Sequence, residues 1–404
     1  MKGKAIFASM LMLLLGVWSC SGPEDGGEIT TLEKSVSARG NTFALEIFPA
    51  LNALQEDENV LISPFSISTA LSMTYNGARG ETQTAMAEAL GFSDMSVEDV
   101  NLAYKNLTNY LRGADNKVTL DIANSIWADA GFSVDSAFLA VNRSYYDAVT
   151  NTLDFGNPAS VATINQWVSD NTNQKIESII DAIPPEAVMY LVNALYFKAA
   201  WTWEFDPDQT VETSFNCYDG GTETVDMMRQ AAEFYYYQND DLQMVDLPYG
   251  DEKFSMTLIL PAYETDINDF IAGITQSEWD SWMDSLSGEK TLVEVRLPRF
   301  SFEYKATLND VLTALGMGPV FAMNADFTGI NPLGGLYISR VLHKTFIEVN
   351  EEGTEAAAAT AVEVGVVSVP DYPVFVANRP FLFAIREQES GSIFFMGKML
   401  GLAE

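Results

Sequence analysis

The sequence predicts an α+β fold built as one large domain. Apolar residues at helical spacing dominate the first half of the 404-residue chain, and alternating or densely apolar runs dominate the second half. No internal repeat, long low-complexity run or domain linker divides the chain after residue 36. Nearly half of the residues are hydrophobic, 48%, so the chain can fill the large core that such a domain needs.

Helices are predicted where apolar residues recur three and four positions apart. Ser66 is expected to cap the second helix, because a serine hydroxyl can accept from a free backbone N–H at a helix start. Gly91 is expected to end the third helix. The helices are predicted over residues 41–54, 66–71, 84–90 and 161–168.

Strands are predicted from two other patterns. Alternation of apolar residues predicts strands with one buried face, and denser apolar runs predict strands in the interior of a sheet. The alternating segments are 120–126, 254–260 and 293–297, and the dense runs are 190–197 and 393–396.

The N-terminus has the pattern of a targeting segment. Lys2 and Lys4 precede an almost wholly apolar run over residues 5–17, and the small Ser19 precedes Cys20. This pattern predicts a signal peptide over residues 1–19 and a lipid on Cys20, followed by a lipidated tether over residues 20–36. The alternative is an ordinary secretory signal that is cleaved nearby.

Composition excludes several classes of function. With 22 basic and 56 acidic residues the net charge is −34, which makes nucleic acid an unfavourable partner. His343 is the only histidine, and Cys20 and Cys217 are the only cysteines, so neither a histidine-rich zinc site nor a disulfide framework can form. The chain also lacks a Gly-x-Ser-x-Gly nucleophile motif and a nucleotide-binding glycine motif. We therefore expect no catalysis, no metal and no cofactor.

A tract of small residues at 351–362 has the alternation of a strand. Counting from Thr354, one alternating set of side chains carries no charge, and both Glu355 and Glu363 fall in the other set. A period of two with one uncharged face describes a strand with one side in a core. Alanine is a poor strand former, so the tract could also stay outside a sheet. An alanine-rich surface helix capped by Thr354 is the alternative.

The remaining motifs, taken in their order and spacing, resemble the serpin family over about residues 40–400. Asn-Val-Leu-Ile-Ser-Pro-Phe-Ser-Ile-Ser begins at Asn59, and Asn-Arg-Pro-Phe-Leu-Phe begins at Asn378. The other family-like segments are 70–73, 77–82, 191–198 with Trp201, Phe205 and Thr210 after it, 343–344 and 391–398.

The resemblance implies a serpin fold, with a large central, mostly antiparallel sheet, further sheets and about nine helices. It implies one serpin domain over residues 37–404, with an exposed reactive-centre loop over about 351–374. Counting as in the family places the reactive bond at Val367-Ser368, or one or two residues later. The implied hinge residues are Glu351, Gly353, Thr354, Glu355, Ala356, Ala357, Ala358, Ala359 and Thr360.

The resemblance also assigns a role to the lone histidine. In serpins a polar cluster lies under the centre of the main sheet and acts as a gate to its opening. The residues that match this sheet-gate cluster are Ser63, Ser66, Asn193, Trp201 and His343. The alternative for His343 is a satisfied core histidine that gates nothing.

The expected function is suicide-substrate inhibition of serine proteases, with cysteine proteases as a further partner class. Small apolar residues around Val367 suit an elastase-like or subtilisin-like protease. A monomer is expected, anchored outside the cytoplasm to a bacterial membrane, at the outer membrane or the cell surface. The alternatives are a non-inhibitory serpin that acts as a binding or storage module, and a purely structural surface lipoprotein.

Overall fold

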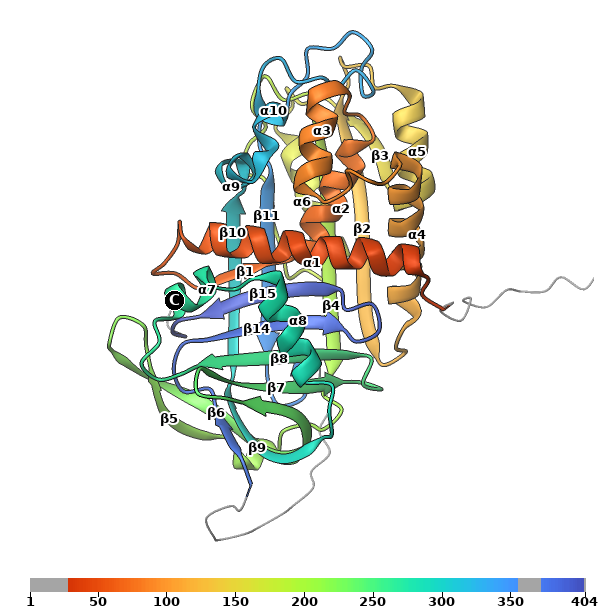
Figure 1. Cartoon of the computed structure of the whole chain (residues 1–404). Coiled ribbons are helices and arrows are strands. Elements are labelled where there is room, and N and C mark those ends of the chain that lie inside the picture. Colours follow the sequence, from red (N-terminus) through yellow and green to blue (C-terminus); the bar gives the residue numbers. More distant parts are fainter. Residues whose placement is uncertain (1–27, 355–371, 403–404) are drawn as a thin grey trace, which may run out of the picture.

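The computed structural model describes residues 28–354 and 372–402, and within them two sheets carry a set of helices (Figure 1). The central sheet has six strands in the order β10-β11-β12-β4-β2-β3, antiparallel except for the β2–β3 pair. Its strands are β10 (Phe300–Thr307), β11 (Leu342–Val349), β12 (Gly353–Thr354), β4 (Met189–Ala200), β2 (Val118–Asp129) and β3 (Val149–Leu153).

The second sheet has nine strands and lies in the lower half of Figure 1, where part of it crosses in front of the central strands. The order along it is β1-β15-β14-β8-β7-β6-β9-β13, and β5 pairs with β6 beside that path. Its strands are β1 (Val60–Ile62), β5 (Val211–Asn216), β6 (Thr222–Gln238), β7 (Leu242–Tyr249), β8 (Phe254–Pro261), β9 (Thr291–Pro298), β13 (Val374–Val376), β14 (Phe381–Glu387) and β15 (Ile393–Met399).

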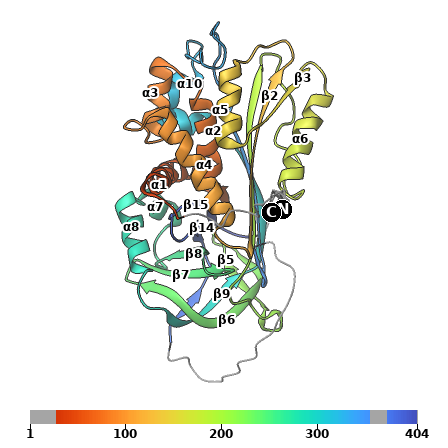
Figure 2. The same ribbon diagram turned by 90° about the vertical axis from the view of Figure 1, so that its right-hand side faces the viewer.

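Helices cover both faces of the central sheet. Seen along the edge of that sheet, α6 lies on one side, and α2, α4 and α5 lie on the other (Figure 2). The longer helices are α1 (Thr31–Asn52), α2 (Pro64–Tyr75), α3 (Gly80–Ala89), α4 (Val97–Gly113), α5 (Ser136–Tyr146), α6 (Ala159–Asn171) and α8 (Gln276–Ser285). The shorter ones are α7 (Ile267–Ala272), α9 (Asn309–Leu312), α10 (Gly318–Phe321), a 3-10 turn at Pro207–Gln209 and a π turn at Thr313–Met317.

The predicted α+β class with a large, mostly antiparallel central sheet is confirmed. All five predicted strands exist, within β2, β4, β8, β9 and β15. Three helix starts were wrong, and the third helix begins at Gly80 rather than at residue 84. The first helix begins at Thr31 rather than at residue 41, because Thr30 and Glu33 form a reciprocal capping box. Residues 31–36 of the predicted tether are therefore helical, and Val36 is buried.

The second helix is capped by Ser63 and not by Ser66. The Ser63 hydroxyl accepts from the Ser66 backbone N–H at 3.3 Å, and Pro64 occupies the first turn, where its missing N–H costs nothing. Ser66 thus lies inside the helix, and its hydroxyl is available for contacts outside it.

Candidate functional site

The candidate site is a gap in the central sheet between β4 and β11, called the receiving gap below. In the described residues these two strands share no register pair and are joined only through the two-residue strand β12. Two cavities lie between them, one of about 20 Å³ beside Thr354 and one of about 200 Å³ at the far end of the gap. β4 and β11 are therefore unpaired along most of the length where one more strand could be inserted.

The hinge start, residues 351–354, enters the receiving gap at one end. Thr354 lies opposite Ala199 of β4 and Val349 of β11, and its hydroxyl is 2.6 Å from that of Tyr249. Gly353 passes so close to β4 that a Cβ would lie 2.0 Å from the Ala199 carbonyl oxygen, so only glycine fits there.

An ion pair with Arg299 holds Glu351, the first residue of the hinge start. The Glu351 side chain is 5% exposed, and Arg299 Nε donates to its two oxygens at 2.7 and 2.6 Å. The Thr210 hydroxyl also donates to Glu351. Burial alone would raise the pKa of Glu351, but these hydrogen bonds outweigh it and the pKa is lowered. Glu351 is thus held as a carboxylate.

Aromatic residues support the same end of the gap. Trp201 stacks on Tyr249 with ring centres 4.4 Å apart, and its indole N–H donates to the Asn350 carbonyl at 2.9 Å. The Trp201 backbone N–H donates to the Glu352 carbonyl at 2.8 Å. Trp201 therefore positions the hinge start.

A polar cluster, formed by Ser63, Ser66, Asn193 and His343, lies farther along the gap at the start of α2. Ser63 donates its backbone N–H to His343 Nε2 at 3.0 Å, and the Ser66 hydroxyl donates to the Asn193 amide oxygen. Asn193 in turn donates to Asn124 of β2 at 2.8 Å. The cluster joins the two strands that border the gap through the N-terminus of one helix.

His343 is neutral in this setting. It is 5% exposed, and burial lowers its pKa to about 3. A neutral ring is what the contact requires, because Nε2 accepts the Ser63 N–H and a protonated nitrogen could not.

The segment that follows α6 crosses the receiving gap on the outer face of the sheet. Asn173 donates to the Tyr196 hydroxyl of β4 at 3.1 Å, and Lys175 donates to Glu348 of β11 at 2.9 Å. The Lys175 ammonium also lies 4.9 Å from the centre of the Phe346 ring. These contacts hold β4 and β11 at their present separation without pairing them.

The structure thus brings together four of the five predicted gate residues. Trp201 was wrongly included, because it lies eight residues beyond Asn193, roughly 26 Å along the strand direction. The hinge residues from Glu355 to Thr360, the bond Val367-Ser368 and Cys20 lie outside the described residues. Sequence reasoning missed Arg299, Tyr249 and Asn124, which are distant in the chain from their partners and belong to no spaced motif. It named Thr210 only as a family-like residue, without a partner.

The described residues offer neither a metal centre nor a membrane-spanning helix. No group of histidine, cysteine, aspartate and glutamate side chains in residues 28–354 and 372–402 is arranged to hold a metal ion. Within the same ranges, no helix has the length and apolar character that a membrane span requires.

Comparison with known proteins identifies the family. The model of the family described as serpin (serine protease inhibitor) matches residues 38–401. Human neuroserpin is 33% identical over 88% of this chain and 89% of its own length. An uncharacterised serpin-like protein of Thermococcus kodakarensis is 36% identical over 91% of this chain and 86% of its own.

Solved structures agree with the sequence matches. The thermophilic serpin tengpin in its native state is similar with a TM-score of 0.82 at 35% identity, over 93% of this chain and 96% of tengpin. Human thyroxine-binding globulin in complex with its hormone gives 0.84 at 27% identity, over 92% of this chain and all of that one (100%). The chain belongs to the serpin family, whose members are generally protease inhibitors rather than catalysts.

Proposed function

We propose that this chain is a suicide-substrate inhibitor of serine proteases that traps the acyl-enzyme by inserting its own loop into the receiving gap. One observation carries the proposal: Gly353 and Thr354 are already hydrogen-bonded between β4 and β11. A strand that has begun to form in an otherwise open gap needs only to be extended.

The register of this short strand determines where an extended one would lie. Because β12 is antiparallel to both neighbours, each step forward in the hinge is one step back in β4 and in β11. Thr360 is six residues after Thr354, and would therefore lie opposite Asn193 in β4 and His343 in β11. The second threonine of the hinge would meet the polar cluster, where a hydroxyl can be satisfied.

Side-chain character supports the same register. Residues an even number of positions from Thr354 share its buried face. Up to residue 364 this face carries only threonine, alanine and valine. The valines would fall beside the larger cavity, whose walls include Leu71, Leu191 and Leu342.

The chemistry begins as ordinary proteolysis. The serine hydroxyl of the protease would attack the Val367 carbonyl, the Val367–Ser368 bond would break, and the new Ser368 amine would leave. An ester would then join Val367 to the protease. Insertion of the freed hinge would move the protease before water could hydrolyse that ester.

The test is incubation with elastase-like, subtilisin-like, chymotrypsin-like and trypsin-like serine proteases, followed by a denaturing gel. We expect a complex that survives detergent, most readily with the first two classes. Thr354→Arg would drive a guanidinium into a buried site, so we expect cleavage of that variant without a complex. Thr213→Arg, at an exposed strand position, is the matched control and should trap as wild type does.

The same experiment distinguishes inhibition from the alternative function, a non-inhibitory binding or storage module. If wild type traps none of the panel and gains no thermal stability when its loop is cleaved, the inhibitory function is wrong. If Thr354→Arg traps as efficiently as wild type, loop insertion is not the mechanism.

We further propose that the protein acts outside the cytoplasm, anchored to a bacterial membrane by a lipid on Cys20. Support comes from the sequence pattern before Cys20. An anchored inhibitor would protect the surface that carries it.

A further inference from the structure

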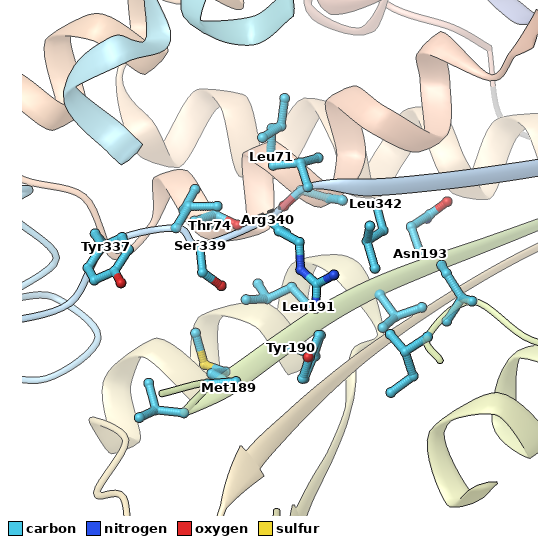
Figure 3. A pocket seen from close by; sticks show the side chains of 18 of the residues that line it. Leu71, Thr74, Met189, Tyr190, Leu191, Asn193, Tyr337, Ser339, Arg340 and Leu342 are labelled. Atoms are coloured by element: carbon cyan, nitrogen blue, oxygen red, sulfur yellow. Dashed lines mark hydrogen bonds between the residues drawn. The ribbon is translucent and has the colours of Figure 1, made fainter. Parts of the chain in front are cut away.

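The larger cavity of the receiving gap has features that strand insertion alone does not require. It measures about 200 Å³ and lies between the first residues of β4 and the segment that leads into β11 (Figure 3). That is more than the roughly 150 Å³ of an engineered apolar cavity that binds benzene. Apolar side chains from three elements form its walls, among them Leu71, Leu191 and Leu342.

Two cationic side chains, those of Arg340 and Lys344, line the cavity beside these apolar walls. Figure 3 shows the Arg340 side chain extending across the cavity toward Tyr190 and Leu191. Arg340 is exposed at the mouth of the cavity. Its planar guanidinium has N–H donors that can hold a carboxylate by two parallel hydrogen bonds.

The acids near this mouth leave Arg340 without an ion pair in the described part of the chain. Asp181 pairs with Lys305 at 2.8 Å, and Glu303 pairs with Lys344 at 2.6 Å. Glu186 also lines the cavity, and its negative charge contributes to the raised pKa of Tyr190. This charge would repel a bound anion and so weaken its binding.

We propose that this cavity binds a small amphipathic carboxylate, an unbranched acyl chain whose tail fills the apolar interior and whose carboxylate pairs with Arg340. The chemistry of the site matches that class: leucine side chains on three elements, an arginine at the mouth and a neighbouring tyrosine hydroxyl.

The ligand would compete with the inserting hinge. Extending the β12 register places residues 360–364 opposite Asn193 to Met189 of β4, and these β4 residues line the cavity. A bound acyl chain leaves the entry at Thr354 free and blocks the far end of the gap. Insertion would stop partway, the acyl-enzyme would hydrolyse, and the inhibitor would be consumed as a substrate. This regulatory half rests on the proposed function; the binding half does not.

Binding is tested first, with decanoate as the probe and isothermal titration calorimetry on the intact protein. We expect one site, with 1-decanol binding about tenfold or more weakly, because the contact to a charged group is lost. Arg340→Gln should weaken the affinity for decanoate by a similar factor and leave the affinity for 1-decanol unchanged. Arg143→Gln, an exposed arginine on α5, is the matched control and should change neither.

Two further samples test the location. Ala70→Leu, on the α2 wall of the cavity, should fill the space and abolish decanoate binding. Protein cleaved in its loop should also lose the site. The proposed site is wrong if wild type does not bind decanoate. It is also wrong if Arg340→Gln binds decanoate as tightly as wild type does, or if Ala70→Leu binds it undiminished.

Regulation is tested last, by the number of inhibitor molecules consumed per protease trapped. This number should rise with decanoate in wild type and stay constant in Arg340→Gln at the same concentration. A constant number in wild type, with the site occupied, overturns the regulatory half. If wild type traps no protease even without decanoate, the proposed function fails while the binding result stands.

Discussion

The buried, neutral His343 makes a specific prediction about stability and pH. Its pKa is about 3 in the folded protein and is expected near 6.5 in the unfolded chain. Between pH 3 and pH 6.5, His343 is largely protonated in the unfolded chain and largely neutral in the folded protein. The contribution of His343 is therefore fully present above pH 6.5 and is lost as the pH falls from 6.5 toward 3.

The magnitude follows from the two pKa values. Between pH 7 and pH 5, protonation of His343 in the unfolded chain lowers the free energy of unfolding by about 2 kcal/mol. At the entropy of unfolding typical of a domain of this size, that corresponds to about 2–3 °C in the midpoint temperature. Most of this loss falls below pH 6.5.

The assay compares wild type with His343→Gln by calorimetry at pH 7, 6 and 5. Glutamine stays neutral and its amide oxygen can still accept the Ser63 N–H. The many carboxylates titrate equally in both proteins, so the difference between them isolates His343. We expect wild type to lose about 2–3 °C more than the variant between pH 7 and pH 5. Parallel pH profiles would refute the assignment of a buried, neutral histidine.

Three other predictions concern the hinge, the loop and the anchor. Glu351→Gln should lower the free energy of unfolding by about 1–3 kcal/mol, because a buried partner of Arg299 loses its charge. Denaturant unfolding measures this loss, with Glu303→Gln as the control variant, and equal losses in the two variants would contradict the prediction. Val367→Arg should move trapping from elastase-like to trypsin-like proteases, read as association rates, and an unchanged preference would place the reactive bond elsewhere. Cys20→Ala should abolish labelling by a fatty-acid analogue in cells, and equal labelling would exclude a lipid on Cys20.

Much of the fold could be predicted from the sequence because the signals were local. The alternation at residues 254–260 and the dense run at 393–396 each lie within one strand, as predicted. The start of α1 was missed because the prediction relied on apolar spacing alone. The cap at Thr30 and Glu33 was present in the sequence and could have located it.

The candidate site was less predictable because its contacts join distant segments. Glu351 and Arg299 are 52 residues apart, and Tyr249 and Thr354 are 105 apart. No periodicity relates such pairs, and only the packing of two sheets brings them together. His343 is the exception: it stood out because it is the only histidine, and the resemblance supplied its neighbours.

The partial strand at Gly353–Thr354 changes the energetics that a proposed insertion would face. Starting a strand inside a closed sheet would require two edges to separate before any new hydrogen bond forms. Here that step is complete at one end, so insertion would proceed by extension. Ten further residues reach the level of Met189, and at about 0.5–1.5 kcal/mol for each hydrogen bond they could add roughly 5–15 kcal/mol. The contacts that oppose it include the pair of Lys175 with Glu348, the bond of Asn173 to Tyr196, and the polar cluster at His343 and Asn193. The first two contacts are partly exposed and weak beside that gain, so they would not by themselves prevent extension of the strand.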